Sequence, residues 1–142
     1  PKAADFLRSL RRAAKEGKTL VTVFGRKRRP GVVSQERLKE LQNEFCNFHM
    51  QSPISDFTLH STMEMNPKLK KEGAHVVNLI HDATLTEYPD DSVEREQQIA
   101  GIVKETMETV PTKWMTTPIK FKVDIKTGTH WGLLTKRKDL SK

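Results

Sequence analysis

His81 and Asp82 interrupt an otherwise apolar, β-rich run, VVNLIHDATLTEY, which spans residues 76–88. Asp is depleted in strand interiors, and a carboxylate is rarely buried unless it is paired or binds a metal. The run is also long for a single strand. A hairpin that turns at His81 and Asp82 would make two strands of ordinary length and place both side chains at its tip. Such a tip can hold a carboxylate where it binds Mg²⁺, although spacing alone favours a simple turn residue at Asp82.

Phosphoryl transfer by two metal ions needs at least one further carboxylate to bridge the metals. The other acidic residues do not suit this role. Asp56 lies within a helical pattern, and Asp90 and Asp91 precede the start of another helix. Asp124 falls on the polar face of an alternating stretch, among lysines. Spacing alone therefore leaves both interpretations of Asp82 open.

The positive charge of the chain is concentrated at its N-terminal end. Residues 1–30 hold ten Lys or Arg against two acids, whereas the whole chain carries a formal net charge of +7. The remaining residues are thus close to neutral. This distribution favours a polyanionic partner, although a solvated helix face followed by a basic turn would have the same composition.

Length and composition limit the class of protein. With 142 residues and a hydrophobic share of 35%, the chain is one domain with a modest core, or one piece of a larger domain. No run is long and apolar enough to span a membrane, and the N-terminus does not have the pattern of a signal peptide. The only cysteine, Cys46, excludes an internal disulfide, so we expect a cytoplasmic protein.

Hydrophobic periodicity and turn residues predict the order of elements. In chain order these are a helix at 2–16, a strand at 19–24, a basic turn at 25–31, a long helix from about residue 34, a loop at 66–73, the hairpin at 76–88, a helix at 92–109, a strand at 119–126 and a loose tail at 135–142. Pro53 should kink or split the long helix. Short loops and the clean alternation at 119–126 favour an α+β fold, an antiparallel sheet with helices packed on one face.

Four stretches, taken together, resemble the motifs of one enzyme family. They are FGRKRR at 24–29, NFHMQSPISD at 47–56, LIHDA at 79–83 and TGTHWG at 127–132. In order and spacing they are similar to the basic F-G-R-R-R turn, the N-x-P-x-Q-G-x-x-x-D helix, the V-H-D-E hairpin and the closing G-x-N-W-G of the family A DNA polymerases. This is the group of bacterial polymerase I and its phage relatives.

The resemblance implies a catalytic role for the hairpin tip. In the family, the Asp at the position of Asp82 ligates the catalytic Mg²⁺ ions, and the His at the position of His81 lies beside the primer end. Ala83 stands where the family has Glu. The second metal-binding carboxylate of the family lies outside this sequence, so we expect one protein ligand of a two-metal site here.

The resemblance also implies contacts with product duplex. Asn47 and Gln51 would touch the minor groove, where every base pair presents an acceptor. Arg26 and Arg28 would hold the phosphate backbone, which gives affinity without sequence specificity. Residues 1–142 would then be the C-terminal palm part of a larger polymerase fold.

Three segments of this palm part would carry different tasks: a basic helix and turn (1–33), a minor-groove-contacting helical region (34–66), and a catalytic hairpin, helix and final strand (75–126). The partners would be primer-template DNA, deoxynucleotide triphosphates and a second polypeptide carrying fingers, thumb and the other carboxylate. Without that polypeptide we expect no DNA synthesis. The chain would be a fragment or a split subunit, and if phage-encoded it would act in the cytoplasm of a bacterial host. The alternative is a non-catalytic basic module that binds nucleic acid.

Overall fold

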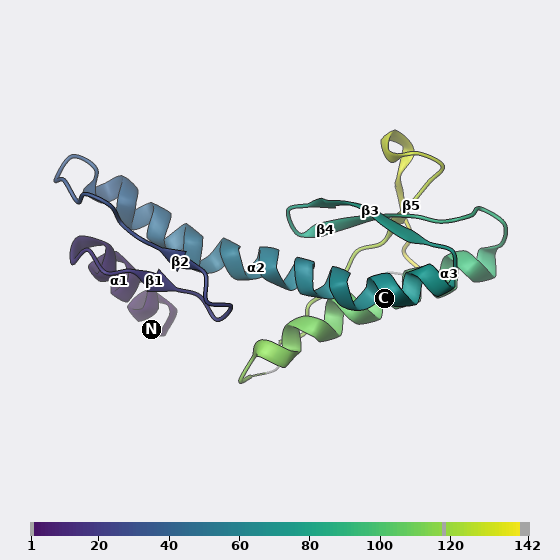
Figure 1. Ribbon diagram of the computed structural model, residues 1–142, viewed down its shortest axis with the longest axis horizontal. Helices are drawn as coiled ribbons and strands as arrows, with labels where there is room; N and C mark the ends of the chain where they lie inside the picture. Colours follow the sequence, from purple (N-terminus) through teal and green to yellow (C-terminus); the bar gives the residue numbers. More distant parts are fainter. Residues whose placement is uncertain (1, 118, 140–142) are drawn as a thin grey trace. The chain divides into compact units, whose positions relative to one another are not determined.

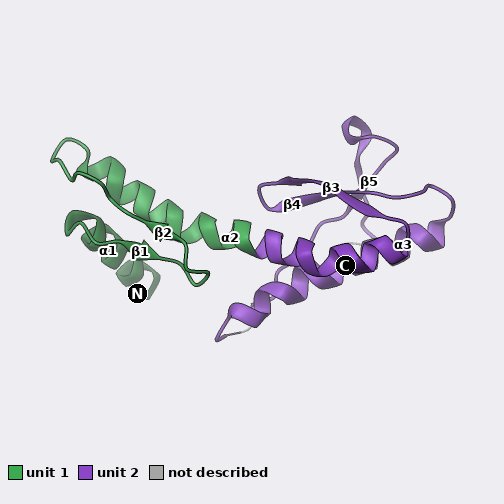
Figure 2. Ribbon diagram, in the orientation of Figure 1, with its two compact units in different colours: residues 1–56 green, residues 57–142 purple. Residues whose placement is uncertain are grey.

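The structure is a computed structural model that describes residues 2–117 and 119–139. It divides into two compact units, an N-terminal unit, Pro1–Asp56, and a C-terminal unit, Phe57–Lys142 (Figure 2). Helix α2, Leu38–Lys71, is labelled in Figure 1, and it contributes residues 38–56 to one unit and 57–71 to the other (Figure 2). No helix among the described residues is long and apolar enough to cross a membrane.

The N-terminal unit packs two helical segments and a short hairpin around a small core. Helix α1, Lys2–Lys15, confirms the predicted helix and ends before Gly17, whose φ of +66° suits glycine. Strands β1, Leu20–Val21, and β2, Lys27–Arg28, pair in antiparallel register. The predicted strand at 19–24 is therefore wrong in extent, because the chain already turns after Val21. The buried cluster consists of Ala14, Leu41 and Phe45.

Helix α2 is longer and more continuous than the sequence predicts. It runs through Pro53 without interruption in its assigned bounds, and it also includes most of the segment predicted as a loop at 66–73. A proline inside a helix removes one hydrogen bond and costs about 3 kcal/mol. Burial of Phe45 on one side of Pro53 and of Leu69 on the other offsets this cost. The helix ends at Lys71, and after Gly73, which has a positive φ, the amide of Ala74 donates to the carbonyl of Leu69 at 2.9 Å.

The C-terminal unit contains the remaining elements. Their bounds are β3 at His75–Ile80, β4 at Ala83–Glu87, α3 at Val93–Thr109, a 3₁₀ turn η1 at Val110–Trp114, β5 at Lys126–Thr127, a 3₁₀ turn η2 at Trp131–Leu133 and β6 at Thr135–Lys136. Ser92 caps α3 by accepting a hydrogen bond from the Arg95 amide, which confirms the predicted helix start. The core joins the end of α2 to α3, with Met65, Leu69, Ile99 and Val103 at its centre.

The described strands form three two-stranded antiparallel pairs, β1 with β2, β3 with β4, and β5 with β6. The α+β class is confirmed. The predicted strand at 119–126 shows the expected alternation, with Phe121, Val123 and Ile125 turned inward and Asp124 exposed. Only its last residue, Lys126, pairs with another strand. The alternating pattern correctly predicted which side chains are buried. It could not predict strand pairing, because pairing also requires a neighbouring strand.

The predicted loose tail at 135–142 is wrong for its first part. Thr135 and Lys136 form β6, and Arg137 makes ion pairs with Glu96 and Asp139. Glu96 on α3 thus orders part of a tail whose polar, charged composition is typical of an exposed loop. Residues 140–142 lie outside the described residues.

Candidate active site and nucleic-acid interface

His81 and Asp82 form the whole turn of the β3–β4 hairpin. Ile80 pairs with Ala83, so only these two residues connect the strands, as the sequence predicts. His81 has a φ of +55°, a backbone conformation that histidine adopts more readily than most residues. Both side chains are exposed. The hairpin therefore presents the Asp82 carboxylate outward from a short, well-defined tip.

The hairpin contacts the C-terminal unit at both of its ends. Near the tip the Thr84 hydroxyl lies 3.7 Å from the Met107 sulfur, and at the other end Val76 in β3 and Tyr88, directly after β4, pack against the core. The tip is thus carried on an element that packs against the core. Positioning a reactive side chain on such an element is more accurate than positioning it on a long loop.

A cavity of about 450 Å³ lies beside the tip. Its walls are strand β4, helix α3 and the segment from Val123 to Leu134, with Ile99 and Val103 at the apolar base. Three carboxylates line it, Asp82, Glu96 and Asp124. Asp124 is exposed, as predicted, and pairs with Lys136 at 2.8 Å. The sequence pattern did not reveal that Asp82 and Asp124, 42 positions apart, share one cavity.

Asn47 and Gln51 lie one turn apart on α2, so their side chains share a helix face. Both are exposed. Met50 and Ile54, also on this helix, are exposed to 56% and 44%. The first half of α2 therefore offers two amide groups and adjoining apolar surface to a partner.

Arg26 and Arg28 both make ion pairs that the sequence did not predict. Arg26 binds Asp56 with its Nε 2.7 Å from Oδ1 and 2.9 Å from Oδ2, and Arg28 binds Glu44 on the same helix. Asp56 is buried. A signal for its pair was present, because a carboxylate among apolar helix residues needs a partner, the same reasoning that singled out Asp82.

The four resembling stretches thus have defined places: the β1–β2 turn, the first half of α2, the β3–β4 tip, and the segment from β5 to η2. The sequence of residues 1–133 matches the protein-family model described as DNA polymerase family A. The chain belongs to DNA polymerase family A. The DNA polymerase I of Deinococcus radiodurans is 29% identical over 113 residues, which are 78% of this chain and 11% of that protein. The thermostable DNA polymerase I of Thermus filiformis is 29% identical over 128 residues, 86% of this chain and 14% of that protein.

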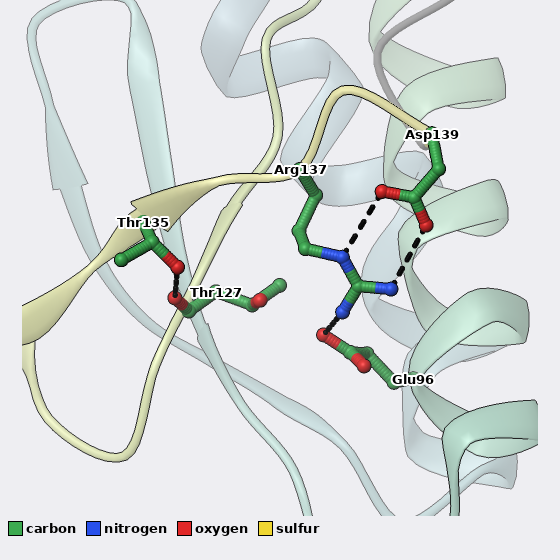
Figure 3. A network of polar contacts seen from close by, with 5 residues as sticks. All are labelled: Glu96, Thr127, Thr135, Arg137 and Asp139. Carbon is green, nitrogen blue, oxygen red and sulfur yellow. Dashed lines mark hydrogen bonds and ion pairs between the residues drawn. The ribbon is translucent and has the colours of Figure 1, made fainter.

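In this family A chain, a polar network ties the C-terminal segment to α3 (Figure 3). Arg137 Nη1 lies 2.6 Å from Glu96 Oε1, and its Nη2 lies 2.9 Å from Asp139 Oδ2 (Figure 3). Thr135 donates to the Thr127 carbonyl at 3.3 Å and so closes the β5–β6 pair. These contacts hold in place the segment from Val123 to Leu134, which forms one wall of the cavity. Hydrogen bonds with Asp139 and Glu96 raise the pKa of Arg137 above its ordinary value, so the guanidinium stays charged.

Tyr88 directly follows β4 and lies next to this network. Burial and the negative charges of Glu96 and Asp90 raise the pKa of its hydroxyl, because both disfavour the phenolate. A hydrogen bond with Glu96 acts in the same direction. Glu96 therefore contacts both Arg137 in the tail and Tyr88 beside the hairpin.

The side chains of this family A chain can provide some, but not all, of the oxygen ligands of a Mg²⁺ ion. A magnesium ion in a phosphoryl-transfer enzyme is held by one or two carboxylates together with substrate phosphates and water. The exposed carboxylate of Asp82 meets that requirement. Among residues 2–117 and 119–139, no group of three or more His, Cys, Asp or Glu side chains forms a metal cluster. The chain spans at most 14% of the length of the two relatives.

Proposed function

We propose that residues 1–142 are the C-terminal palm part of a DNA-directed DNA polymerase. The chain would supply one metal-binding carboxylate and contacts with product duplex for template-directed nucleotidyl transfer. Membership of family A supports the reaction class. The observation that carries the assignment to this hairpin is the exposed Asp82 at a two-residue tip beside a cavity.

Asp82 would hold the catalytic Mg²⁺ together with a carboxylate from elsewhere. When bound, the metal ions would lower the pKa of the primer 3′-hydroxyl and stabilise the charge that develops on the pyrophosphate. The tip fixes the direction of the Asp82 carboxylate, and His81 would lie beside the primer terminus. Ala83 cannot provide the carboxylate that the family has at this position, so positioning of the primer end would fall to the neighbouring His81.

The N-terminal half would hold the product duplex. Amide donors such as Asn47 and Gln51 can test pair geometry in the minor groove without reading sequence, because the acceptors there are common to all base pairs. Arg28 and the exposed Arg29 would contact phosphates from the basic segment 1–33. Weak duplex binding without sequence preference is expected.

The working enzyme would need a second polypeptide with the fingers, the thumb and the other palm carboxylate. Residues 1–33 would serve as basic helix and turn, 34–66 as the minor-groove region, and 75–126 as the catalytic hairpin, helix and last strand. As a split subunit of a phage polymerase, the chain would act in the cytoplasm of a bacterial host.

Complementation tests the proposal. The chain is mixed with a second family A polypeptide, which stops at the position that precedes residue 1 of this chain. Templated extension is then measured with Mg²⁺ and saturating primer-template. Asp82→Asn keeps the size of the side chain but removes its charge. It should lower the extension rate at least about a hundredfold, the scale of losing one electrostatic stabiliser, while assembly and duplex binding remain.

Asp90→Asn is the matched control, because Asp90 is an exposed Asp just beyond β4 and away from the tip. It should extend primers at nearly the wild-type rate. Equal rates for Asp82→Asn and wild type, within a few-fold, would leave Asp82 as a turn residue only. A wild-type mixture that binds duplex but never extends would instead favour the non-catalytic nucleic-acid-binding module.

A further inference from the structure

Arg26 is engaged with a buried carboxylate, in contrast to its expected role at a phosphate. Its Nε lies 2.7 Å and 2.9 Å from the two oxygens of Asp56, and its Nη2 lies 2.7 Å from Oδ1. The Asp56 side chain is 6% exposed, and that of Arg26 is 53% exposed. Charge-assisted contacts of this two-oxygen kind are strong and directional. The pair joins the β1–β2 hairpin to α2 across 30 positions of sequence.

The backbone around Arg26 is itself held in place. The Thr22 amide donates to the Arg26 carbonyl at 2.9 Å, and the Arg26 amide donates to the Thr22 hydroxyl at 3.2 Å. Thr22 is buried. The Gly25 amide closes the turn onto the Thr22 carbonyl at 2.9 Å. The Arg26 side chain therefore extends from a hydrogen-bonded turn, and its guanidinium binds a buried carboxylate.

The geometry of α2 relates this pair to the proposed duplex contacts. With 3.6 residues per turn, Asp56 lies about 140° around the helix from Gln51 and about 180° from Asn47. The face that Arg26 grips is thus opposite to the face that carries the two amides. A helix held on one face by the hairpin presents its other face in one orientation.

We propose that Arg26 is a positioning residue, which clamps Asp56 and thereby sets the rotation of α2 that presents Asn47 and Gln51. It does not itself hold a phosphate. The functional half of this inference rests on the proposed duplex contacts. The structural half, a specific coupling between Arg26 and Asp56, stands without them, so two measurements separate the two halves.

The first measurement is amide hydrogen exchange of the full chain without DNA. Arg26→Gln and Asp56→Asn should each speed exchange at residues 22–28 and 52–56, by about threefold to a hundredfold. The double variant should exceed neither single variant by more than about twofold, because the clamp is already lost. Full additivity of the two effects would overturn the clamp.

The second measurement is the affinity for a mixed-sequence duplex over a series of KCl concentrations. Arg26→Lys keeps the charge but loses the planar fork that grips both oxygens. It should weaken binding as much as Arg26→Gln, and both should keep the wild-type salt slope. Arg29→Gln is the control for a phosphate contact and should reduce the magnitude of the slope by about 0.9. The same reduction for Arg26→Gln, with wild-type affinity for Arg26→Lys, would make Arg26 a phosphate ligand and overturn the inference.

A further comparison isolates positioning from a general loss of stability. In a background that carries both Asn47→Ala and Gln51→Ala, Arg26→Lys should lower affinity by less than about twofold, because the contacts that it positions are already gone. The full loss in that background would overturn the positioning role. If the wild-type chain binds no duplex, the proposed duplex contacts fail, and the exchange measurement alone decides whether the clamp exists.

Discussion

Helix α2 packs a different kind of surface in each of the two units. In the N-terminal unit it buries Leu41 and Phe45 in a small cluster and uses Glu44 and Asp56 to bind arginines. In the C-terminal unit its buried residues join a larger apolar cluster with α3. The unit proposed to meet a polyanion is thus held partly by the arginines that a polyanion attracts. The unit proposed to hold a catalytic carboxylate also contains ion pairs, such as Arg137 with Glu96, but there α2 is held by apolar packing, which is insensitive to nearby phosphate charge.

Leu69→Ala should have the largest effect on this comparison. Leu69 is fully buried at the junction of α2 and α3, so its truncation removes apolar contacts and leaves a cavity. We expect the free energy of unfolding to fall by about 2–5 kcal/mol in urea titration. Exchange protection should be lost mainly at residues 57–139.

Met63→Ala is the matched control on the same helix, because the Met63 side chain is 64% exposed. Its change in the free energy of unfolding should stay within about 0.5 kcal/mol. Equal loss of protection in both units on Leu69→Ala would show that they unfold as one, and the contrast between them would then have no energetic meaning.

High salt should act on the other unit, with a smaller effect. Raising KCl to about 1 M shortens the screening length to about 3 Å, which weakens exposed ion pairs by less than about 1 kcal/mol each. Exchange at residues 22–28 should rise, because the hairpin depends on the Arg26 and Arg28 pairs. Exchange at the core residues of α3, Ile99 and Val103, should be unchanged or slower, whereas the Glu96–Arg137 pair should weaken as the hairpin pairs do. Faster exchange in α3 than in the hairpin would reverse the assignment of charge to one unit and packing to the other.

The smallest expected effect concerns Tyr88 and pH. Its pKa is raised in the folded chain, so the neutral phenol is favoured by folding. The resulting stability is fully present below the unfolded pKa, near 10, and is lost as the pH rises through the higher folded value. Tyr88 is the only tyrosine, so phenolate absorbance reports it directly. Tyr88→Phe should remove this step from the pH dependence of stability, and an absorbance midpoint at or below that of the unfolded chain would contradict it.

Local interactions explain what the sequence could predict. The hairpin at residues 76–88 and the Ser92 cap follow from strand length and from a side chain three residues from its partner amide. The burial alternation of residues 119–126 follows from a period of two. Each of these features is decided within about a dozen residues of chain.

The missed features depend on contacts between distant segments. Pro53 lies within α2 because packing on both sides of it outweighs a local penalty, and no local pattern measures that balance. Arg137 orders part of the tail through Glu96, which lies 41 positions away. The partner of Arg26 was missed for the same reason, although burial of Asp56 in a helical pattern was a usable signal.

The two-residue connection between β3 and β4 limits how this chain can vary. Because side chains alternate between faces along a strand, one residue inserted or deleted between Ile80 and Ala83 would shift the pairing and turn the inner side chains of a strand outward, unless a bulge absorbed it. The shift in register between Val76 and Asn78 shows where this hairpin already accommodates one extra residue. Substitution beside the tip can change its chemistry, as Ala83 illustrates, while the two-residue connection keeps its length.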